Sequence, residues 1–178
     1  MQINESVING VFEIENKMFQ DHRGLFVKTF HEETFEKNGL STNFKESFYS
    51  VSAKNVIRGM HFQKPPHDHA KLVYVTSGEI LDVVLDIRKD SATYGRSISF
   101  RLSSENGRSV YIEKGCAHGF LTLSNSATVV YSTSTVHSAE ADSGVLWNSF
   151  NFDWGIQNPI ISGRDEVFPS FAQLSEDC

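Results

Sequence analysis

The chain has 178 residues, enough for a single domain whose core buries roughly two thirds of the surface of the unfolded chain. Its formal net charge of -6 excludes the broad basic surface of a nucleic-acid-binding protein, although local basic residues can still bind a small anion. The N-terminus, Met1 to Glu5, lacks the charged and apolar regions of a signal peptide, and no apolar run approaches the ~20 residues of a membrane span, so we expect a soluble, cytoplasmic protein.

The predicted elements are short strands with one short helix. Residues 7–14 and 25–30 are predicted strands separated by a turn-like cluster at 19–24, and residues 32–38, closed by Gly39, are the predicted helix. The remaining predicted strands are 44–52, 56–63, 71–77, 79–88, 96–102, 109–112, 119–123 and 128–135. Turns at Gly78 and Gly107 help to space these strands at about ten residues, which predicts an all-β antiparallel sandwich or barrel.

The alternation of side chains along two of these strands indicates a partly polar interior. Within residues 80–87 one face is wholly apolar, whereas the other carries Asp82 and Asp86 among apolar residues. Within residues 129–137, Tyr131 and His137 have the same parity and share one surface. A barrel with polar groups inside holds a ligand rather than packing solid.

The stretch around Arg58, His61 and Lys71 places polar side chains in apolar, strand-like sequence. Such groups cost several kcal/mol when buried without a partner, so they usually have a role. Arg58 and His61 have opposite parity, and we expect Gly59 to allow the bulge or twist that brings both to one site.

Each candidate also has a structural explanation when it is considered alone. His61 fits a core histidine that bonds a carbonyl, Lys71 fits an edge lysine that opposes aggregation, and Tyr131 fits a core tyrosine. Arg23 fits a solvated turn residue. The two cysteines, Cys116 and Cys178, are expected to be reduced thiols, because one bridge to a chain end is a poor framework.

The joint pattern of motifs resembles the nucleotide-sugar 3,5-epimerases typified by dTDP-4-dehydrorhamnose 3,5-epimerase. The motifs run in order from Arg58-Gly59-Met60-His61-Phe62-Gln63 through Lys71, Gly78-Glu79, Asp86-Ile87-Arg88-Lys89, Gly115-Cys116-Ala117-His118-Gly119-Phe120 and Tyr131 to Ser162-Gly163-Arg164-Asp165. The resemblance implies a cupin-type jelly-roll barrel, with residues 1–178 as one domain that usually forms a homodimer. It also implies an isomerase that needs no metal or organic cofactor and acts on a nucleoside-diphosphate-linked 4-keto-6-deoxy sugar.

The resemblance assigns catalytic roles to four residues. His61 is the base that removes a proton beside the ketone, and Asp165 is the carboxylate that orients it. Lys71 stabilises the enolate oxygen, and Tyr131 returns a proton from the opposite face of the sugar.

Substrate binding is implied at further positions, some of which depart from the family pattern. Arg23, Arg58 and His118 match positions that bind the diphosphate and the sugar, Arg164 belongs to the last motif, and Phe26 matches a residue that helps close the site, in some cases across the dimer. The departures are Lys28 for a glutamate, Glu46-Ser47-Phe48 for Gln-Asp-Asn, His137 for a tyrosine that stacks on thymine, and Asp142 for a glutamate. They predict the same enolisation chemistry on a different dTDP- or CDP-linked sugar, epimerised at C3, C5 or both.

Two other classes of function are left open by the sequence. His67 and His69 form the His-x-His pair of metal-dependent cupins, with His118 as a third ligand, but the expected carboxylate is absent and Lys71 adds a like charge. The other possibility is a sugar-nucleotide 3,4-ketoisomerase or a non-catalytic binding protein on the same barrel. An exchange of His61 for asparagine separates a binding protein from an epimerase, since only the epimerase loses proton exchange.

Overall fold

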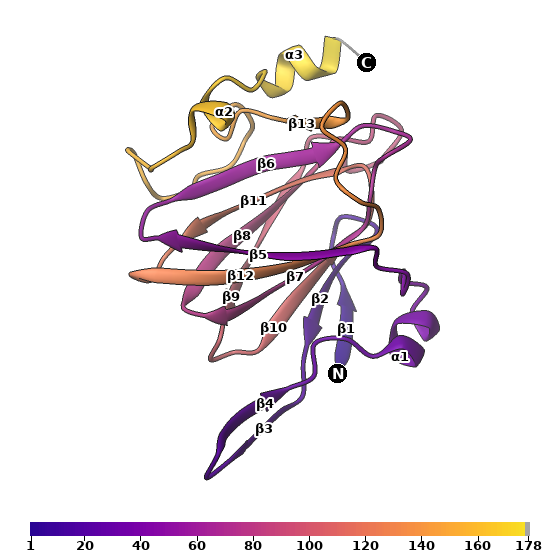
Figure 1. The fold of residues 1–178 in the computed structure, drawn as a ribbon. Helices are drawn as coiled ribbons and strands as arrows, with labels where there is room; N and C mark the ends of the chain where they lie inside the picture. The colour runs from indigo at the N-terminus through magenta and orange to yellow at the C-terminus, as the bar shows by residue number, and fades with distance from the viewer. Residues whose placement is uncertain (177–178) are drawn as a thin grey trace.

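Two antiparallel sheets facing one another make up most of the computed structural model in Figure 1, which describes residues 1–176. The first sheet has the order β1 (Gln2–Glu5), β2 (Val11–Glu15), β10 (Arg108–Ile112), β7 (Lys71–Ser77), β12 (Ser126–Thr133) and β5 (Glu46–Ala53). The second has the order β13 (Asp142–Gly144), β6 (Ile57–Gln63), β11 (Cys116–Thr122), β8 (Glu79–Asp86) and β9 (Ser97–Ser103). This arrangement confirms the predicted all-β, cupin-type jelly roll.

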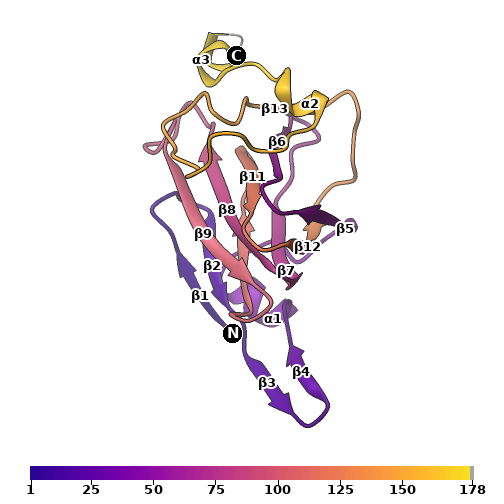
Figure 2. The ribbon, with the colours of Figure 1, turned by 90° about the vertical axis from the view of Figure 1, so that its left-hand side faces the viewer.

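The smaller elements lie at the two ends of the barrel. A separate hairpin of β3 (Met18–Asp21) and β4 (Gly24–Val27) extends away from the sheets, as Figures 1 and 2 both show. Helix α1 (Glu32–Lys37) follows the hairpin in the chain, and α2 (Gly163–Glu166) and α3 (Phe171–Glu176) lie at the opposite end. No helix among residues 1–176 combines the length and the apolar character needed to cross a membrane.

Two predicted elements agree closely with the structure, and two do not. The strand predicted over 71–77 coincides with β7, and the predicted helix is α1, followed by Gly39 at a φ of +72°. The strand predicted over 7–14 begins only at Val11, because residues 7–10 turn the chain from β1 into β2. The turn predicted over 19–24 is partly wrong, since Met18–Asp21 is a strand. This exposed ribbon lacks the apolar alternation that marks a half-buried strand.

The five-stranded sheet separates two apolar clusters, as the parity of β8 predicts. Ile80 and Val84 belong to the core between the sheets, whereas Val83 and Leu85 pack on the other face beneath the C-terminal segment. That segment contributes its own aromatic residues to the second cluster, namely Trp147, Phe150, Phe152, Trp154 and Phe171. The sheet is therefore covered on both faces.

The core between the sheets fills only part of the barrel. On β7 and β12, Val73, Val75 and Val129 belong to this core. Lys71 and Thr133, which pair with each other at one end of these two strands, line a cavity. The fold thus places its polar strand ends around an open space.

Cys116 is a buried free thiol, and burial raises its pKa to about 12, so it stays protonated and unreactive. Cys178, the other cysteine expected to be reduced, lies outside the described residues.

Candidate active site

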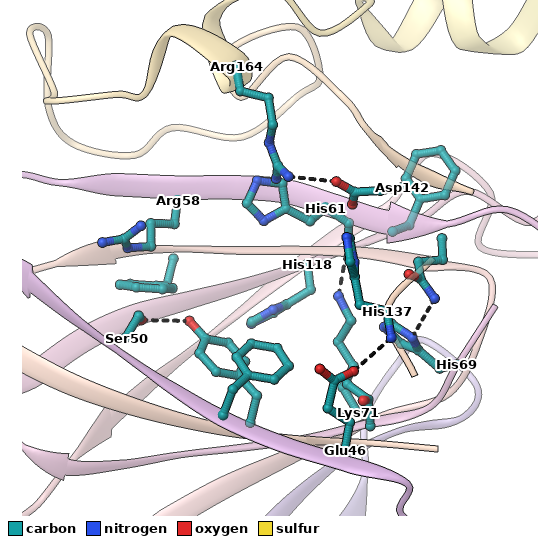
Figure 3. A pocket seen from close by; sticks show the side chains of 16 residues that line it. Glu46, Ser50, Arg58, His61, His69, Lys71, His118, His137, Asp142 and Arg164 are labelled. Atoms are coloured by element: carbon teal, nitrogen blue, oxygen red, sulfur yellow. Dashed lines mark hydrogen bonds and ion pairs between the residues drawn. The ribbon is translucent and has the colours of Figure 1, made fainter. Parts of the chain in front are cut away.

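A cavity of about 460 Å³ opens between the two sheets. Most of the predicted site residues line it, namely Glu46, Phe48, Arg58, His61, Lys71, His118, Tyr131, His137, Asp142 and Arg164. In Figure 3, Ser50 and Arg58 lie toward one end of the view, and Glu46, His69 and His137 lie toward the other. One pocket therefore collects side chains from positions that are scattered along the sequence.

His61 and Tyr131 reach this cavity from opposite sheets. His61 is on β6 of the five-stranded sheet, and Tyr131 is on β12 of the six-stranded sheet. An imidazole and a phenol consequently face the same space from two sides, as inversion at a carbon requires.

Gly59 allows Arg58 and His61 to share the cavity despite their opposite parity. His61 pairs with His118 and Arg58 pairs with Phe120, so β6 has one residue more than β11 between these pairs. Gly59 has a φ of +123°, and a Cβ atom there would lie 2.5 Å from the Cα of Gly119. The bulge expected from the sequence is confirmed, and it needs glycine.

Asp165 lies behind His61 and orients its ring. Ser162 caps α2 by accepting a hydrogen bond from the Asp165 backbone N–H at 3.2 Å, and this places the carboxylate against β6. Asp165 Oδ1 lies 2.9 Å from His61 Nε2, and Oδ2 accepts the Gly59 N–H at 3.0 Å. Burial raises the pKa of Asp165, but the bonds from His61, Gly59 and Arg164 outweigh it and lower the pKa to about 2.

The Asp165 contact determines which nitrogen of His61 can act as a base. An ionised carboxylate only accepts hydrogen bonds, so Nε2 carries the proton and Nδ1 keeps the free lone pair. Burial lowers the pKa of His61, and Asp165 opposes that shift, so the ring is neutral at pH 7. A neutral imidazole backed by a carboxylate is suited to removing a proton.

Lys71 brings a desolvated ammonium group into the same cavity. Burial lowers its pKa to about 8, opposed by the charges of Asp142 and Asp82. Its Nζ donates a hydrogen bond to the backbone carbonyl of His61 at 3.3 Å. The ammonium group is thus held beside His61, where it can stabilise negative charge on an oxygen atom in the cavity.

Tyr131 is held between aromatic side chains with its hydroxyl at the cavity. Its ring stacks on Phe48 with centroids 4.8 Å apart and an interplanar angle of 18°, and its hydroxyl lies 3.2 Å from Ser50 Oγ. Burial raises its pKa, so the phenol stays protonated at neutral pH and can donate a proton. His118 packs edge-on against the ring at 6.1 Å and pairs with buried Asp82 at 2.7 Å.

Three of the residues that depart from the family pattern have hydrogen bonds or ion pairs at the cavity wall. Glu46 Oε2 accepts the backbone N–H of His137 at 2.7 Å. Asp142 pairs with Arg164 at 2.6 Å, and Arg164 also reaches Asp165 at 3.2 Å. Arg164 therefore links Asp142 to Asp165, the carboxylate that contacts His61.

Three predicted substrate-binding residues do not reach the cavity of their own chain. Arg23 and Phe26 belong to the protruding hairpin and Lys28 directly follows it, and all three are exposed. Arg23 instead pairs with Asp21 at 2.6 Å. A two-stranded ribbon that leaves the barrel cannot return its side chains to the same barrel, so their substrate contacts stay a prediction.

The geometry gives no support to the metal-dependent cupin. The His67 ring is exposed on the loop before β7, and His69 contacts Gln63 and Thr135. Among residues 1–176, no group of three or more histidine, cysteine, aspartate or glutamate side chains is placed to hold a metal ion.

Several cavity residues were not predicted as substrate contacts. They are Ser50, Phe62, Gln63, His69, Phe120 and Thr133. The alternation of β5 already puts Ser50 on the same face as Glu46 and Phe48, so that signal was present in the sequence.

Known proteins resemble this chain in both sequence and fold. A family model described as dTDP-4-dehydrorhamnose 3,5-epimerase matches residues 5–173. The enzyme of that name from Shigella flexneri is 40% identical over 168 residues, covering 93% of each chain. The crystal structure of the Bacillus anthracis enzyme with TDP and PPi bound is 37% identical with a TM-score of 0.91, covering 95% of this chain and 98% of that chain. A 3'-monoepimerase from Streptomyces bikiniensis, in complex with dTDP-quinovose, is 29% identical with a TM-score of 0.92, covering 97% of this chain and 89% of that chain. The chain belongs to the dTDP-4-dehydrorhamnose 3,5-epimerase family.

Proposed function

We propose that this protein is an epimerase that inverts C3, C5 or both carbons of a dTDP-linked 4-keto-6-deoxyhexose in deoxysugar biosynthesis. The observation that carries the proposal is the placement of His61, backed by Asp165, and Tyr131 around one cavity from opposite sheets. Lys71 lies in the same cavity. The names of the family relatives support the thymidine-linked sugar as the substrate class.

The first step is removal of the proton on the carbon next to the ketone. His61 takes the proton on Nδ1, and Asp165 stabilises the imidazolium that forms on the other side of the ring. The electron pair of the broken C–H bond moves to the ketone oxygen, and the Lys71 ammonium stabilises that enolate oxygen.

The second step returns a proton to the same carbon from the other face. Tyr131 donates its hydroxyl proton to the enolate carbon, which restores the ketone with inverted configuration. Proton exchange between His61, Tyr131 and water then resets both groups for another turnover.

The other cavity residues bind the substrate. Arg58 and Arg164 supply donors for the diphosphate and the sugar, and His118 lines the same cavity with its Nε2 directed to Asp82. The departures from the family pattern, at Glu46, Phe48, His137 and Asp142, contact the nucleobase and the sugar and adapt the pocket to its own substrate.

The hairpin completes the cavity of a second subunit in a homodimer. Phe19 and Phe26 are 50% and 61% exposed on β3 and β4, which is unusual for large apolar rings unless a partner covers them. Arg23, Phe26 and Lys28 then reach substrate in the partner's cavity. Mixing an Arg23→Ala variant with a His61→Asn variant tests this, because a mixed dimer has one intact site and regains activity that neither variant has alone.

Proton exchange in deuterated water tests the catalytic proposal. The protein is incubated with dTDP-4-keto-6-deoxyglucose, and with the CDP-linked sugar in parallel, while proton NMR follows C3 and C5 separately. Deuterium uptake at either carbon, lost in His61→Asn although ligand binding persists, is the expected result. If no carbon exchanges in either nucleotide sugar, the epimerase proposal is wrong, and retained exchange in His61→Asn would rule out His61 as the base.

A further inference from the structure

Ser50 is a cavity residue to which the proposed mechanism gives no role. It lies on β5, the edge strand of the six-stranded sheet, and lines the cavity. Its Oγ lies 3.2 Å from the Tyr131 hydroxyl oxygen, a contact that Figure 3 draws as a dashed line at Ser50. Within residues 1–176 the Tyr131 hydroxyl has no other hydrogen-bond partner. The acid of the proposed mechanism is therefore held at its reacting atom by one side chain.

The pairing of β5 with β12 produces this contact. Phe48 lies opposite Tyr131, and Ser50 lies opposite Val129, so Ser50 is the diagonal neighbour of Tyr131 on the same face of the sheet. Diagonal neighbours in an antiparallel pair are within reach of an aromatic side chain. The Tyr131 ring stacks on Phe48 and extends its hydroxyl to Ser50. The contact thus belongs to two regular strands and not to a loop.

The chemistry of the second step determines which hydroxyl donates. Either hydroxyl is able to donate in this contact. If Tyr131 donated to Ser50, its hydrogen would be engaged there and not directed at the substrate carbon. In the proposed step the Tyr131 O–H bond breaks, a C–H bond forms and a phenolate remains. A phenolate only accepts hydrogen bonds, so Ser50 is the donor.

The surroundings of the Tyr131 oxygen make such a donor necessary. Tyr131 is 8% exposed, and burial raises its pKa, as does the charge of Asp82. The hydrogen bond from Ser50 and the charge of Arg58 oppose this increase in the pKa. The Nε–H of Arg58 donates instead to Ser52 Oγ at 2.8 Å. Ser50 is therefore the group in contact with the oxygen on which negative charge develops.

We propose that Ser50 is a positioning residue that donates a hydrogen bond to the Tyr131 oxygen, directs the phenol hydrogen toward the substrate carbon and stabilises the phenolate. The inference rests on the proposed function and deepens it, since it concerns only the protonation step. Removal of the first proton by His61 does not use this contact. Loss of the Ser50 hydroxyl should consequently slow inversion while proton removal continues.

Ser50→Val and Ser50→Thr are a matched pair, because the two side chains have the same shape and differ in the hydroxyl. In deuterated water, NMR follows deuterium uptake at C3 and C5 of dTDP-4-keto-6-deoxyglucose, and the inverted product is measured after borohydride reduction of the ketone. Ser50→Val should lower the ratio of inverted product to deuterium uptake by about ten- to a hundredfold, the effect of losing one hydrogen bond to a charged group. Ser50→Thr should stay within about threefold of the wild-type ratio. Ser47→Ala is the control, since the Ser47 hydroxyl bonds the Tyr131 backbone carbonyl at 2.9 Å, and it should keep the wild-type ratio.

Two results overturn the inference while the proposed function stands. One is a wild-type ratio in Ser50→Val, including the case in which only KM rises, which would make Ser50 a substrate contact. The other is an equal loss in Ser50→Val and Ser50→Thr, which would assign the effect to packing. If the wild-type protein takes up no deuterium or yields no inverted product, the proposed function fails and the inference fails with it. Thermal melting checks the fold, and Ser50→Ala, compared with the wild type, replaces Ser50→Val if that variant does not fold.

Discussion

Replacing Asp165 by asparagine tests the pairing on which the proposed catalysis depends. The carboxylate of Asp165 receives hydrogen bonds from His61 Nε2 at 2.9 Å, the Gly59 N–H at 3.0 Å and Arg164 Nε at 3.2 Å. An asparagine has the same size but only one acceptor oxygen, so at least one of these donors must face an NH2 group. The substitution removes a charge without leaving a cavity.

The expected loss of stability follows from the pKa of Asp165. That pKa is about 2 in the folded protein against an ordinary value of 3.8, a difference equivalent to about 2 kcal/mol. Because folding lowers the pKa, this stabilisation is present above pH 3.8 and disappears as the pH falls through about 2. Urea unfolding at pH 7 should therefore show Asp165→Asn to be less stable by about 2 kcal/mol, with a smaller difference at pH 3.

The expected effect on activity has two parts with separate causes. The exchange rate falls by about 100- to 10,000-fold, because the imidazolium of His61 loses its carboxylate partner and the ring can adopt the wrong tautomer. The pKa of His61 also falls further, since Asp165 raises it by a hydrogen bond and by its charge. The acid side of the pH profile should consequently move to lower pH while the plateau drops.

Proton exchange measured by NMR from pH 4.5 to 9 reports both effects. Asp142→Asn is the control, because it breaks an ion pair with Arg164 but leaves the contact between Asp165 and His61, and its acid limb should stay in place. Two results for Asp165→Asn would refute the pairing of Asp165 with His61 as the basis of catalysis. One is an exchange rate close to that of the wild type, and the other is an acid limb that stays in place or moves to higher pH.

Three further predictions concern Lys71, Phe48 and Gly59. Burial lowers the pKa of Lys71 to about 8, so the exchange rate of the wild type should fall at alkaline pH with a midpoint near 8. In the same assay, Lys71→Gln should exchange more slowly at every pH, and its rate should show no fall near pH 8. Phe48→Leu removes the ring stacked on Tyr131 at 4.8 Å, so NMR should show continued deuterium uptake but several-fold slower formation of the inverted product. Equal slowing of deuterium uptake and of product formation would contradict a role of Phe48 in positioning the Tyr131 hydroxyl. Gly59→Ala adds a Cβ 2.5 Å from the Gly119 Cα at a φ of +123°, and should cost about 3 kcal/mol or more in urea unfolding. Gly24→Ala has a similar φ of +116° with no atom near the added Cβ, so equal losses in the two variants would show that the close approach of β6 and β11 is not the cause.

The local pattern of the sequence determined the strands and the class of fold. The spacing of the turns predicted an antiparallel sandwich or barrel, and the parity of residues 80–87 and 129–137 predicted a partly polar interior. This was possible because side-chain direction in a strand depends only on parity, which is a local property. The motifs then connected His61, Lys71 and Tyr131 to one family and one chemistry.

The tertiary structure decided how these residues meet and which others join them. His61 and Asp165 are 104 positions apart, and only the docking of α2 against β6 brings the carboxylate to the ring. The same structure adds His69 to the cavity, and it places Arg23 on a hairpin away from the barrel. Such contacts depend on how sheets pair and pack across long separations, and parity along one strand carries no information about what lies opposite. The position of the cavity has the same origin, since it opens where the apolar layers of β7 and β12 end and polar side chains replace them.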